Sequence, residues 1–520
     1  MSQRRLARNI SVMSIAILLS RILGLVRDQV MAFFFGGGYL NDAFNVAYNI
    51  PNLLRRLFGE GALSTAFVPI YNDIGIKKGK EQQINFALNM LSLLTLFLFL
   101  LTLMGIAFAP LIVKLLYPGL APQSTLVAIK LTRIIFPYLF FIGLSSTFIA
   151  ILNSHEYFFM TGLSSALLNI GMILSVVIPY WVFKLPAERL IYPAGWGVMI
   201  GGSMQTLINL PYLKKVGYRL KLMISFSGEA LAMLWKRFVP SMLGIGIREI
   251  NLIADALMAS FLPIGSITAL GYGNRLMQLP LGIFAISAST AVLPMYSRLV
   301  SRKEYAELSR GMRFTTLNLA YIMLPVSTLI LILAPDFVDI LFNQGAFDNK
   351  AALMTSQALV YYSLGLIFYS LNQTLTPLFY AHGDTKTPVK LAAMMVGLNI
   401  ALNAILMQFM AHRGLALSTA ITALVNYLLL RRLITKKLPE VDFSGIYDNL
   451  FKCLICCVLI YVAGSWLAAS LHLYSKLGLI LKSILVSALS FAVFYGLGIL
   501  LKLSYFREAT ASICKRLLRK

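Results

Sequence analysis

The chain has 520 residues, of which 58% are hydrophobic and only 12% are charged, and its formal net charge at pH 7 is +25. A soluble domain carries about 25% charged residues, so this composition excludes a single soluble core. Many apolar runs approach the length that spans a bilayer, and short alternating segments of the β-barrel type are missing, so an all-α integral membrane protein is expected.

About fourteen apolar segments follow one another along the chain, and each is predicted to be a transmembrane helix. In chain order they are residues 9–35, 42–71, 84–116, 124–152, 157–183, 190–213, 233–261, 266–298, 312–342, 352–381, 387–410, 414–433, 446–470 and 477–501. Several are longer than the ~20 residues that cross a bilayer, so tilted or extended helices are expected.

The loops between these segments alternate in charge. Basic runs such as Lys77-Lys78-Gly79-Lys80, Lys214-Lys215 and Lys436-Lys437 fall in every second loop, whereas the intervening loops are short and hold few basic residues. By the positive-inside rule this places both termini in the cytoplasm and favours an even number of helices. The same placement explains the net charge by topology and attraction to anionic lipid, so no nucleic-acid partner is expected.

An internal repeat relates the two halves of the chain. Arg21 and Asp28 match Arg248 and Asp255, 227 residues farther along the chain. Further matches follow in the same order, each separated by about 225–230 residues, as in a parallel repeat. These are Ser64-Thr65-Ala66 with Ser289-Thr290-Ala291, Ala109-Pro110 with Ala334-Pro335, His155 with His382, and Leu168-Asn169-Ile170 with Leu398-Asn399-Ile400. The repeat predicts two pseudo-symmetric six-helix lobes, residues 1–222 and 223–440, followed by an appendage of two helices and a basic tail, residues 441–520.

Several arginines lie inside the predicted membrane segments, and four of them are candidate substrate-binding residues: Arg21 and Arg27 in the first segment, Arg55 in the second and Arg275 in the eighth. Charges at membrane depth are costly and persist where they face a wet cavity or a partner. Guanidinium groups bind phosphate oxygens in bidentate fashion, so a cationic cavity between the halves that takes a pyrophosphate is predicted. The alternative is structural, through snorkelling or ion pairing, and we expect it for Arg56 with Glu60 at i,i+4.

A weaker polar set lies in the seventh, eleventh and twelfth segments. It contains Asp255, Asn399, Asn403 and Thr419, whose oxygens would suit a monovalent cation. Hydrogen bonding between helices is the other interpretation, since Asn and Thr often do this in membranes. The four cysteines and the histidines show no metal-ligand spacing, and nucleotide-binding and hydrolase motifs are missing, so no other metal, no cofactor and no enzyme activity is expected.

Several sequence stretches carry a family resemblance that covers the whole chain. They are Ser20-Arg21-Ile22-Leu23-Gly24-Leu25-Val26-Arg27-Asp28, Asp42-Ala43-Phe44, Pro51-Asn52-Leu53-Leu54-Arg55-Arg56-Leu57-Phe58, Glu60-Gly61-Ala62, Ala66-Phe67-Val68-Pro69, Asn274-Arg275-Leu276-Met277-Gln278-Leu279-Pro280 and Gly383-Asp384-Thr385-Lys386-Thr387-Pro388. In these residues the chain resembles the MurJ/MviN family of the multidrug/oligosaccharidyl-lipid/polysaccharide exporter superfamily.

The resemblance implies a flippase of the bacterial inner membrane that moves lipid II, an undecaprenyl-pyrophosphate-linked glycopeptide, to the periplasmic leaflet for cell-wall synthesis. It implies substrate contacts at the four arginines, and also at Asp42, Glu60 and Thr268. It implies a lipid-tail groove on the last two helices and, in some members, a sodium site that matches the polar set above. The chain departs from the family at Asn274, Gln278 and Asn403, where some members have acids.

Other functions remain open at this point. A related flippase for another polyprenyl-linked glycan would carry the same pyrophosphate, and a drug exporter for cations would need an acidic cavity. A membrane glycosyltransferase or lipid phosphatase would need a catalytic cluster of acids or histidines, which the loops lack. The candidate driving forces are Na⁺ and the membrane potential, and enzymes of cell-wall synthesis are candidate partners.

Overall fold

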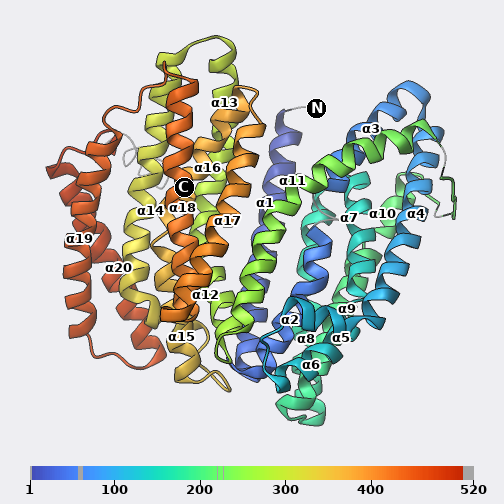
Figure 1. Ribbon diagram of the computed structural model, residues 1–520, viewed down its shortest axis with the longest axis horizontal. Coiled ribbons are helices and arrows are strands. Elements are labelled where there is room, and N and C mark those ends of the chain that lie inside the picture. The colour runs from blue at the N-terminus through green and yellow to red at the C-terminus, as the bar shows by residue number, and fades with distance from the viewer. Residues whose placement is uncertain (1–2, 57–61, 220, 227, 507–520) are drawn as a thin grey trace. The chain divides into compact units, whose positions relative to one another are not determined.

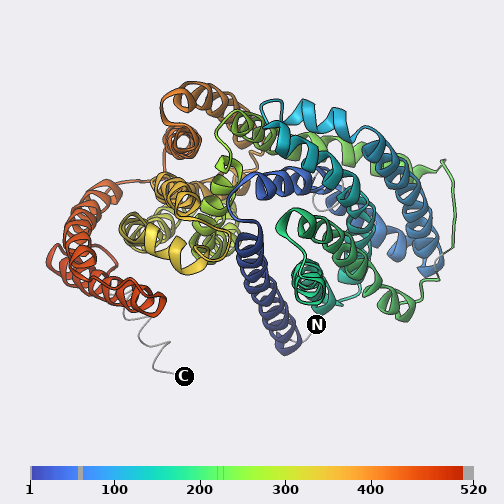
Figure 2. The ribbon, with the colours of Figure 1, turned by 90° about the horizontal axis from the view of Figure 1, so that it is seen from below.

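The computed structural model describes residues 3–56, 62–219, 221–226 and 228–506. Every regular element in these ranges is a helix, which confirms the all-α prediction. By packing, the chain divides into two compact units, which Figures 1 and 2 show in sequence colours. Unit 1 consists of Met1–Gly265 and Gln344–Phe347, and unit 2 of Ser266–Asn343 and Asp348–Lys520.

Unit 1 contains the first eleven helices. They are α1 (Gln3–Phe35), α2 (Tyr39–Arg55), α3 (Ala62–Lys78), α4 (Lys80–Ala107), α5 (Ala109–Leu116), α6 (Pro122–Ile135), α7 (Tyr138–Ser154), α8 (Phe158–Phe183), α9 (Ala187–Leu207), α10 (Leu210–Lys215) and α11 (Glu229–Ser260). The predicted segments 42–71, 84–116, 124–152 and 190–213 each fall on two helices instead of one. In the second of these α4 gives way to α5 just before Pro110, whose ring cannot continue a helix.

Unit 2 contains the remaining helices. They are α12 (Ser266–Pro280), the π-helical turn η2 (Leu281–Ala285), α13 (Ile286–Ser301), α14 (Tyr305–Leu341), α15 (Asn349–Ser363), α16 (Leu366–Ala381), α17 (Lys386–Met410), α18 (His412–Lys437), α19 (Ile446–Ser470) and α20 (Lys476–Leu500). The π-turn follows Pro280, which removes a backbone donor and shifts the hydrogen-bond register.

The helix that opens the second repeat packs with the first. α11 lies against α3 and belongs to unit 1, although the repeat predicts a lobe boundary at residue 222. The boundary between the packing units is thus one helix later, at Gly265. The predicted lobes 1–222 and 223–440 are defined by the sequence repeat and not by packing, so this division stays a prediction.

Among the described residues, eight helices are long and apolar enough to cross a membrane, or up to ten if each of two bent pairs forms one span. The bent pairs are α6 with α7, at 42°, and α15 with α16, at 43°. All fourteen predicted segments overlap helices, but the count of fourteen crossings stays a prediction.

The two bends occupy matching places in the two halves but have different causes. Pro137 separates α6 from α7 and lacks the backbone N–H that would continue the helix. Gly365 separates α15 from α16, and a Cβ there would lie 2.7 Å from the Cα of Ala420 on α18. A proline in one half and a close helix approach in the other therefore produce the same bend.

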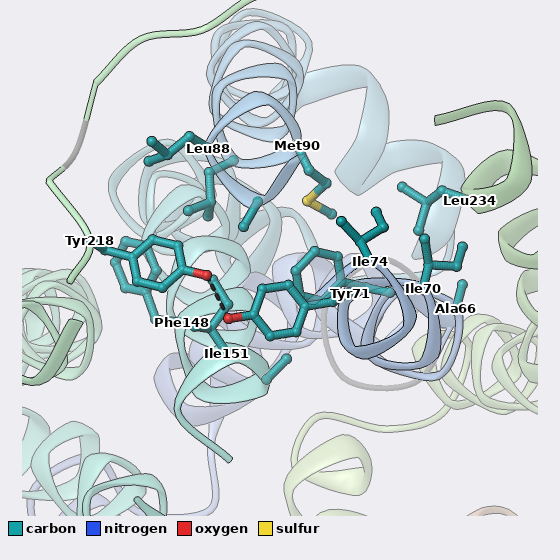
Figure 3. Packing of buried hydrophobic residues seen from close by; sticks show 14 of the residues in the cluster. Ala66, Ile70, Tyr71, Ile74, Leu88, Met90, Phe148, Ile151, Tyr218 and Leu234 are labelled. Atoms are coloured by element: carbon teal, nitrogen blue, oxygen red, sulfur yellow. Dashed lines mark hydrogen bonds between the residues drawn. The ribbon is translucent and has the colours of Figure 1, made fainter. Parts of the chain in front are cut away.

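Two apolar cores hold unit 1 together. One joins α1, α2, α6, α8 and α9 through residues such as Phe35, Phe44 and Val198. The other joins α3, α4 and α7 to the end of α10 and to the start of α11 through Phe67, Tyr71 and neighbouring side chains such as Leu234 (Figure 3). In this second core the hydroxyl groups of Tyr71 and Tyr218 lie 2.6 Å apart, so burial of Tyr218 does not leave its polar atom without a partner.

The two C-terminal helices contact α14 near its C-terminal end and near its middle. Near one end, Lys482 Nζ of α20 lies 2.9 Å from Asp336 Oδ2 of α14, and the two side chains are only 15% and 11% exposed. Near the middle of α14, Tyr321 OH donates to Asn449 Oδ1 of α19 at 3.2 Å. An ion pair and a polar contact thus fix the register of α19 and α20 on α14.

Candidate functional site

Arg27 is the most tightly held of the predicted substrate-binding arginines. It lies on α1 with an 11% exposed side chain, and its Nη2 is 2.9 Å from Asp28 Oδ1. Its Nη1 donates to Asn169 Oδ1 of α8 at 3.0 Å, and its guanidinium carbon lies 6.0 Å from the ring centroid of Tyr48 on α2. Three helices therefore orient one guanidinium group, which lies in a segment predicted from the sequence to cross the membrane.

Asn169 joins α8 to α1 in two directions. While its oxygen accepts from Arg27, its Nδ2 donates to the carbonyl oxygen of Ser20 at 3.1 Å. The residue is only 5% exposed. A buried amide that satisfies both a guanidinium donor and a backbone acceptor fixes the rotation of α1 relative to α8.

The other arginines of unit 1 differ in their surroundings. Arg21 is exposed and lies two turns before Arg27 on α1. Arg55 is half-buried, and its Nε donates to Asn52 Oδ1 at 3.0 Å within α2. Arg21 therefore offers an accessible cation, whereas Arg27 and Arg55 are preorganised by neighbouring polar groups.

Arg56 has a structural partner from another helix. Its Nε lies 2.9 Å from Glu249 Oε2 of α11, and the Glu249 side chain is only 3% exposed. The sequence predicted Glu60 as the partner, and Glu60 lies outside the described residues. The pair with Glu249 holds α2 to α11, because a buried carboxylate needs a cation or donors beside it.

Asp42 is buried near the start of α2. Its residue exposure is 3%, and its Oδ2 accepts a hydrogen bond of 2.6 Å from the backbone N–H of Gly265, just after α11. The carboxylate thus fixes the end of unit 1. A substrate contact at Asp42 stays a prediction.

The predicted contacts in unit 2 lie on α12. Thr268 is buried, whereas Arg275 is exposed and lies in the turn before Pro280 and η2. Gln278 donates to Asn274 across one turn, so the two amides at the positions where some family members have acids bond to each other. Arg275 is therefore flanked by neutral groups on its own helix.

The predicted cation ligands fall in both units. Asn399 and Asn403 of α17 and Ser418 of α18 form a buried hydrogen-bonded trio, in which Asn403 donates to Asn399 Oδ1 at 3.1 Å. Thr419 donates to the carbonyl oxygen of Leu415 on its own helix. Asp255 belongs to unit 1, where it accepts from Asn251 at 3.0 Å. The trio fits the interhelical alternative, and a cation site stays a prediction.

The described residues contain no group of three His, Cys, Asp or Glu side chains that could hold a metal ion. The Gly383-to-Pro388 stretch has a structural role: Asp384 Oδ1 accepts from Thr387 N at 2.9 Å, and Lys437 of α18 donates to both residues. The hydrogen bond from Lys437 holds the pKa of the Asp384 carboxyl well below its usual range. This loop therefore ties α17 to α18.

Comparison with known proteins shows what this arrangement belongs to. The family model "Lipid II flippase MurJ" matches residues 31–485. The chain belongs to the lipid II flippase MurJ family. A probable lipid II flippase MurJ of Buchnera aphidicola subsp. Acyrthosiphon pisum is 34% identical over 86% of this chain and 88% of its own length. The lipid II flippase MurJ of Burkholderia cenocepacia is 34% identical over 79% and 80%.

Solved structures agree with this family. A lipid II flippase MurJ in an inward closed conformation matches 93% of this chain and 98% of its own, with 30% identity and a TM-score of 0.74. An inward-facing multidrug resistance MATE transporter of the MOP superfamily matches 83% and 99%, with 16% identity and a TM-score of 0.66, which shows a shared fold. The chain is therefore a multi-pass membrane protein of a transporter family, and the family resemblance read from the sequence is confirmed.

Sequence reasoning missed the partners that orient the MurJ-family arginines. Asn169 figured only as one member of the internal repeat, and Glu60 instead of Glu249 was predicted to pair with Arg56. The available signal was chemical: a polar residue in an apolar run such as 157–183 needs a polar partner, and a charge in another run is a candidate. Which of many polar residues meets which charge depends on helix packing.

Proposed function

We propose that the protein flips lipid II from the cytoplasmic to the periplasmic leaflet of the bacterial inner membrane by alternating access. The observation that carries this is family membership over most of the chain, together with the arginine that three helices orient in a segment predicted to cross the membrane. The proposal includes fourteen crossings with both termini in the cytoplasm, in keeping with the basic loops.

The pyrophosphate is the part of the substrate that the arginines recognise. Arg21 is exposed and can meet the anion first, while Arg27 and Arg55 are already oriented and lose little side-chain freedom on binding. We expect Arg275 to be required as well. Asp42, Glu60 and Thr268 are proposed to act on the same head group, directly or through the arginines.

The driving force we propose is the membrane potential, with Na⁺ at Asp255, Asn399, Asn403 and Thr419 as the rival. An inside-negative potential favours outward movement of an anion, by about 2.3 kcal/mol per charge for 100 mV if the charge crosses the whole field. Dissipating the potential with valinomycin and K⁺ should then slow flipping, whereas removing Na⁺ should not. The opposite pattern would favour the sodium site. Enzymes that make and use lipid II are the proposed partners.

The test measures which leaflet lipid II occupies in cells depleted of this protein. A lipid II-cleaving toxin that cannot cross the membrane is added outside, and uncleaved lipid II is quantified. Plasmid-borne wild type should restore cleavage, and Arg27→Ala should not, although it inserts normally. Lys77→Ala, at an exposed surface ion pair with Asp73, is the matched control and should rescue.

Two outcomes would contradict the proposal. Full rescue by Arg27→Ala would refute the arginine site. Lipid II that stays accessible outside after depletion, with another polyprenyl-linked glycan trapped inside, would assign the flippase to that glycan.

A further inference from the structure

The connector between α10 and α11 has an unusual position. Its residues 221–226 are extended and run along α4 at the periphery of unit 1, as Figures 1 and 2 both show. Met223 N donates to Ser92 Oγ of α4 at 2.9 Å, and Ser225 N donates to Asn89 Oδ1 at 2.7 Å. Asn89 Nδ2 returns a bond of 3.0 Å to the Ser225 carbonyl. We call residues 221–226 the strap.

The strap shows two different faces. In an extended chain successive side chains point to opposite sides, so Leu222, Ile224 and Phe226 share one side. These three are 76%, 53% and 76% exposed, whereas Met223 packs against the apolar core between α3, α4 and α7. One face is therefore fixed to the protein, and the other presents three large apolar side chains outward.

The depth of the strap follows from its contacts on α4. Ser92 lies twelve residues after Lys80, the first residue of α4, which is about 18 Å along the helix. The helix α4 is a candidate membrane span, and farther along it exposes Leu96, Phe97 and Leu100. The apolar face of the strap therefore lies beside the exposed apolar surface of α4 and nearer to the Lys80 end of that helix. The basic loops place this end of α4 in the cytoplasm.

Basic residues border the strap on that same side. Arg219 and Lys221 are exposed in the connector, and Lys214 and Lys215 are exposed at the end of α10. Apolar side chains next to lysine and arginine are the composition that binds at a membrane interface, with the apolar groups among acyl chains and the cations at anionic head groups.

We propose that the strap is a membrane-interface anchor, which inserts Leu222, Ile224 and Phe226 into the cytoplasmic leaflet and places Arg219 and Lys221 at anionic head groups. The connector between the two repeats is then held at a fixed depth, because lipid contacts one face of the strap and α4 contacts the other. This role is independent of the transported substrate.

The test reads the depth of single labels in the full-length protein in vesicles. The four native cysteines are replaced, and nitroxide labels are placed by Leu222→Cys, Met223→Cys, Ile224→Cys or Phe226→Cys. Leu100→Cys, exposed on α4, is the lipid reference, and Lys78→Cys, exposed at the end of α3, is the water reference. Collisions with oxygen, which partitions into lipid, and with a water-soluble nickel chelate are compared.

The proposal expects labels at 222, 224 and 226 to collide preferentially with oxygen, as at 100, while the label at 223 is shielded from both. Preference for the nickel chelate, as at 78, would overturn it. Shielding of 222, 224 and 226 from both reagents would also overturn it, because it would indicate a second copy or another protein on this face.

A second measurement tests the charged part. Arg219→Gln with Lys221→Gln should make the label at 224 shallower in vesicles that contain phosphatidylglycerol and leave it unchanged in pure phosphatidylcholine. An equal response in both lipids would refute the contact with anionic head groups.

Discussion

Replacing Asn169 separates its role in orienting Arg27 from its role in packing. Asn169→Leu keeps a similar volume but removes the oxygen that accepts from Arg27 and the donor to the Ser20 carbonyl. A hydrogen bond to a charged group contributes about 1.5–3 kcal/mol and a neutral one about 0.5–1.5 kcal/mol. Asn169 is only 5% exposed, so water replaces neither bond well, and we expect a loss of about 2–4 kcal/mol in unfolding free energy.

Asn169→Asp is the informative companion variant. It keeps an oxygen facing Arg27 but adds a second carboxylate beside Asp28, which offsets the guanidinium charge that the pyrophosphate needs. We therefore expect Asn169→Asp to retain more stability than Asn169→Leu. We also expect it to flip lipid II at least ten times more slowly than wild type, which corresponds to a loss of about 1.4 kcal/mol in the free energy of binding the head group.

The assays are denaturation in mixed micelles for stability and toxin accessibility of lipid II for transport. Thr95→Val is the control, since Thr95 bonds only to the Leu91 carbonyl of its own helix. Wild-type flipping by Asn169→Asp would refute the orienting role. Transport losses that simply follow stability in both variants would reduce Asn169 to a packing residue.

Two further perturbations test other polar contacts. Asp336→Asn leaves Lys482 buried without its carboxylate and should lower the unfolding free energy in mixed micelles by about 3–5 kcal/mol. The double variant Asp336→Asn with Lys482→Met should recover most of this loss. Additive losses from the two substitutions would contradict a buried ion pair. Burial, and then the nearby Lys80, lower the pKa of His155 below its unfolded value of about 6.5. The unfolded state therefore binds more protons as pH falls below about 6.5, so stability should decrease from pH 7 downward until the folded pKa is passed. His155→Gln should flatten that slope in unfolding measured across this range, and an unchanged slope would assign it to other groups.

The hydrophobic pattern predicted the helices well because it reports directly on the surrounding solvent. The segment 446–470 coincides with α19, which has no interior proline to disturb it. The segment 42–71 covers two helices, α2 and α3, with residues 57–61 outside the description. An apolar run shows that a stretch avoids water, but it does not show where its axis changes direction.

The partners of the intramembrane charges could not be predicted in the same way. Periodicity places Arg27 on a face of α1, but Asn169 lies 142 residues farther along the chain. Arg56 had an acid within one helical turn in sequence, yet it pairs with Glu249 on α11, 193 residues away. A local rule finds neighbours on one helix, whereas these contacts depend on which helices pack together.

The outer loops of unit 1 determine where the chain can bend between its two units. The chain passes from one unit to the other only at 265/266, 343/344 and 347/348, and both loops involved are predicted to lie on the periplasmic side. On the unit 1 side the backbone is fixed, because Asp42 holds Gly265 N and the Phe33 carbonyl holds Ala346 N at 2.8 Å. Gly36 and Gly345 allow this close approach. A Cβ on Gly36 would collide with the carbonyl oxygen of Ala346, and a Cβ on Gly345 would collide with that of Phe33. A change in angle between the units would therefore be taken up by torsions up to Asn343 and from Ser266 and Asp348 onward, so stiffening these short joints is expected to slow the proposed cycle without touching a residue that binds the cargo.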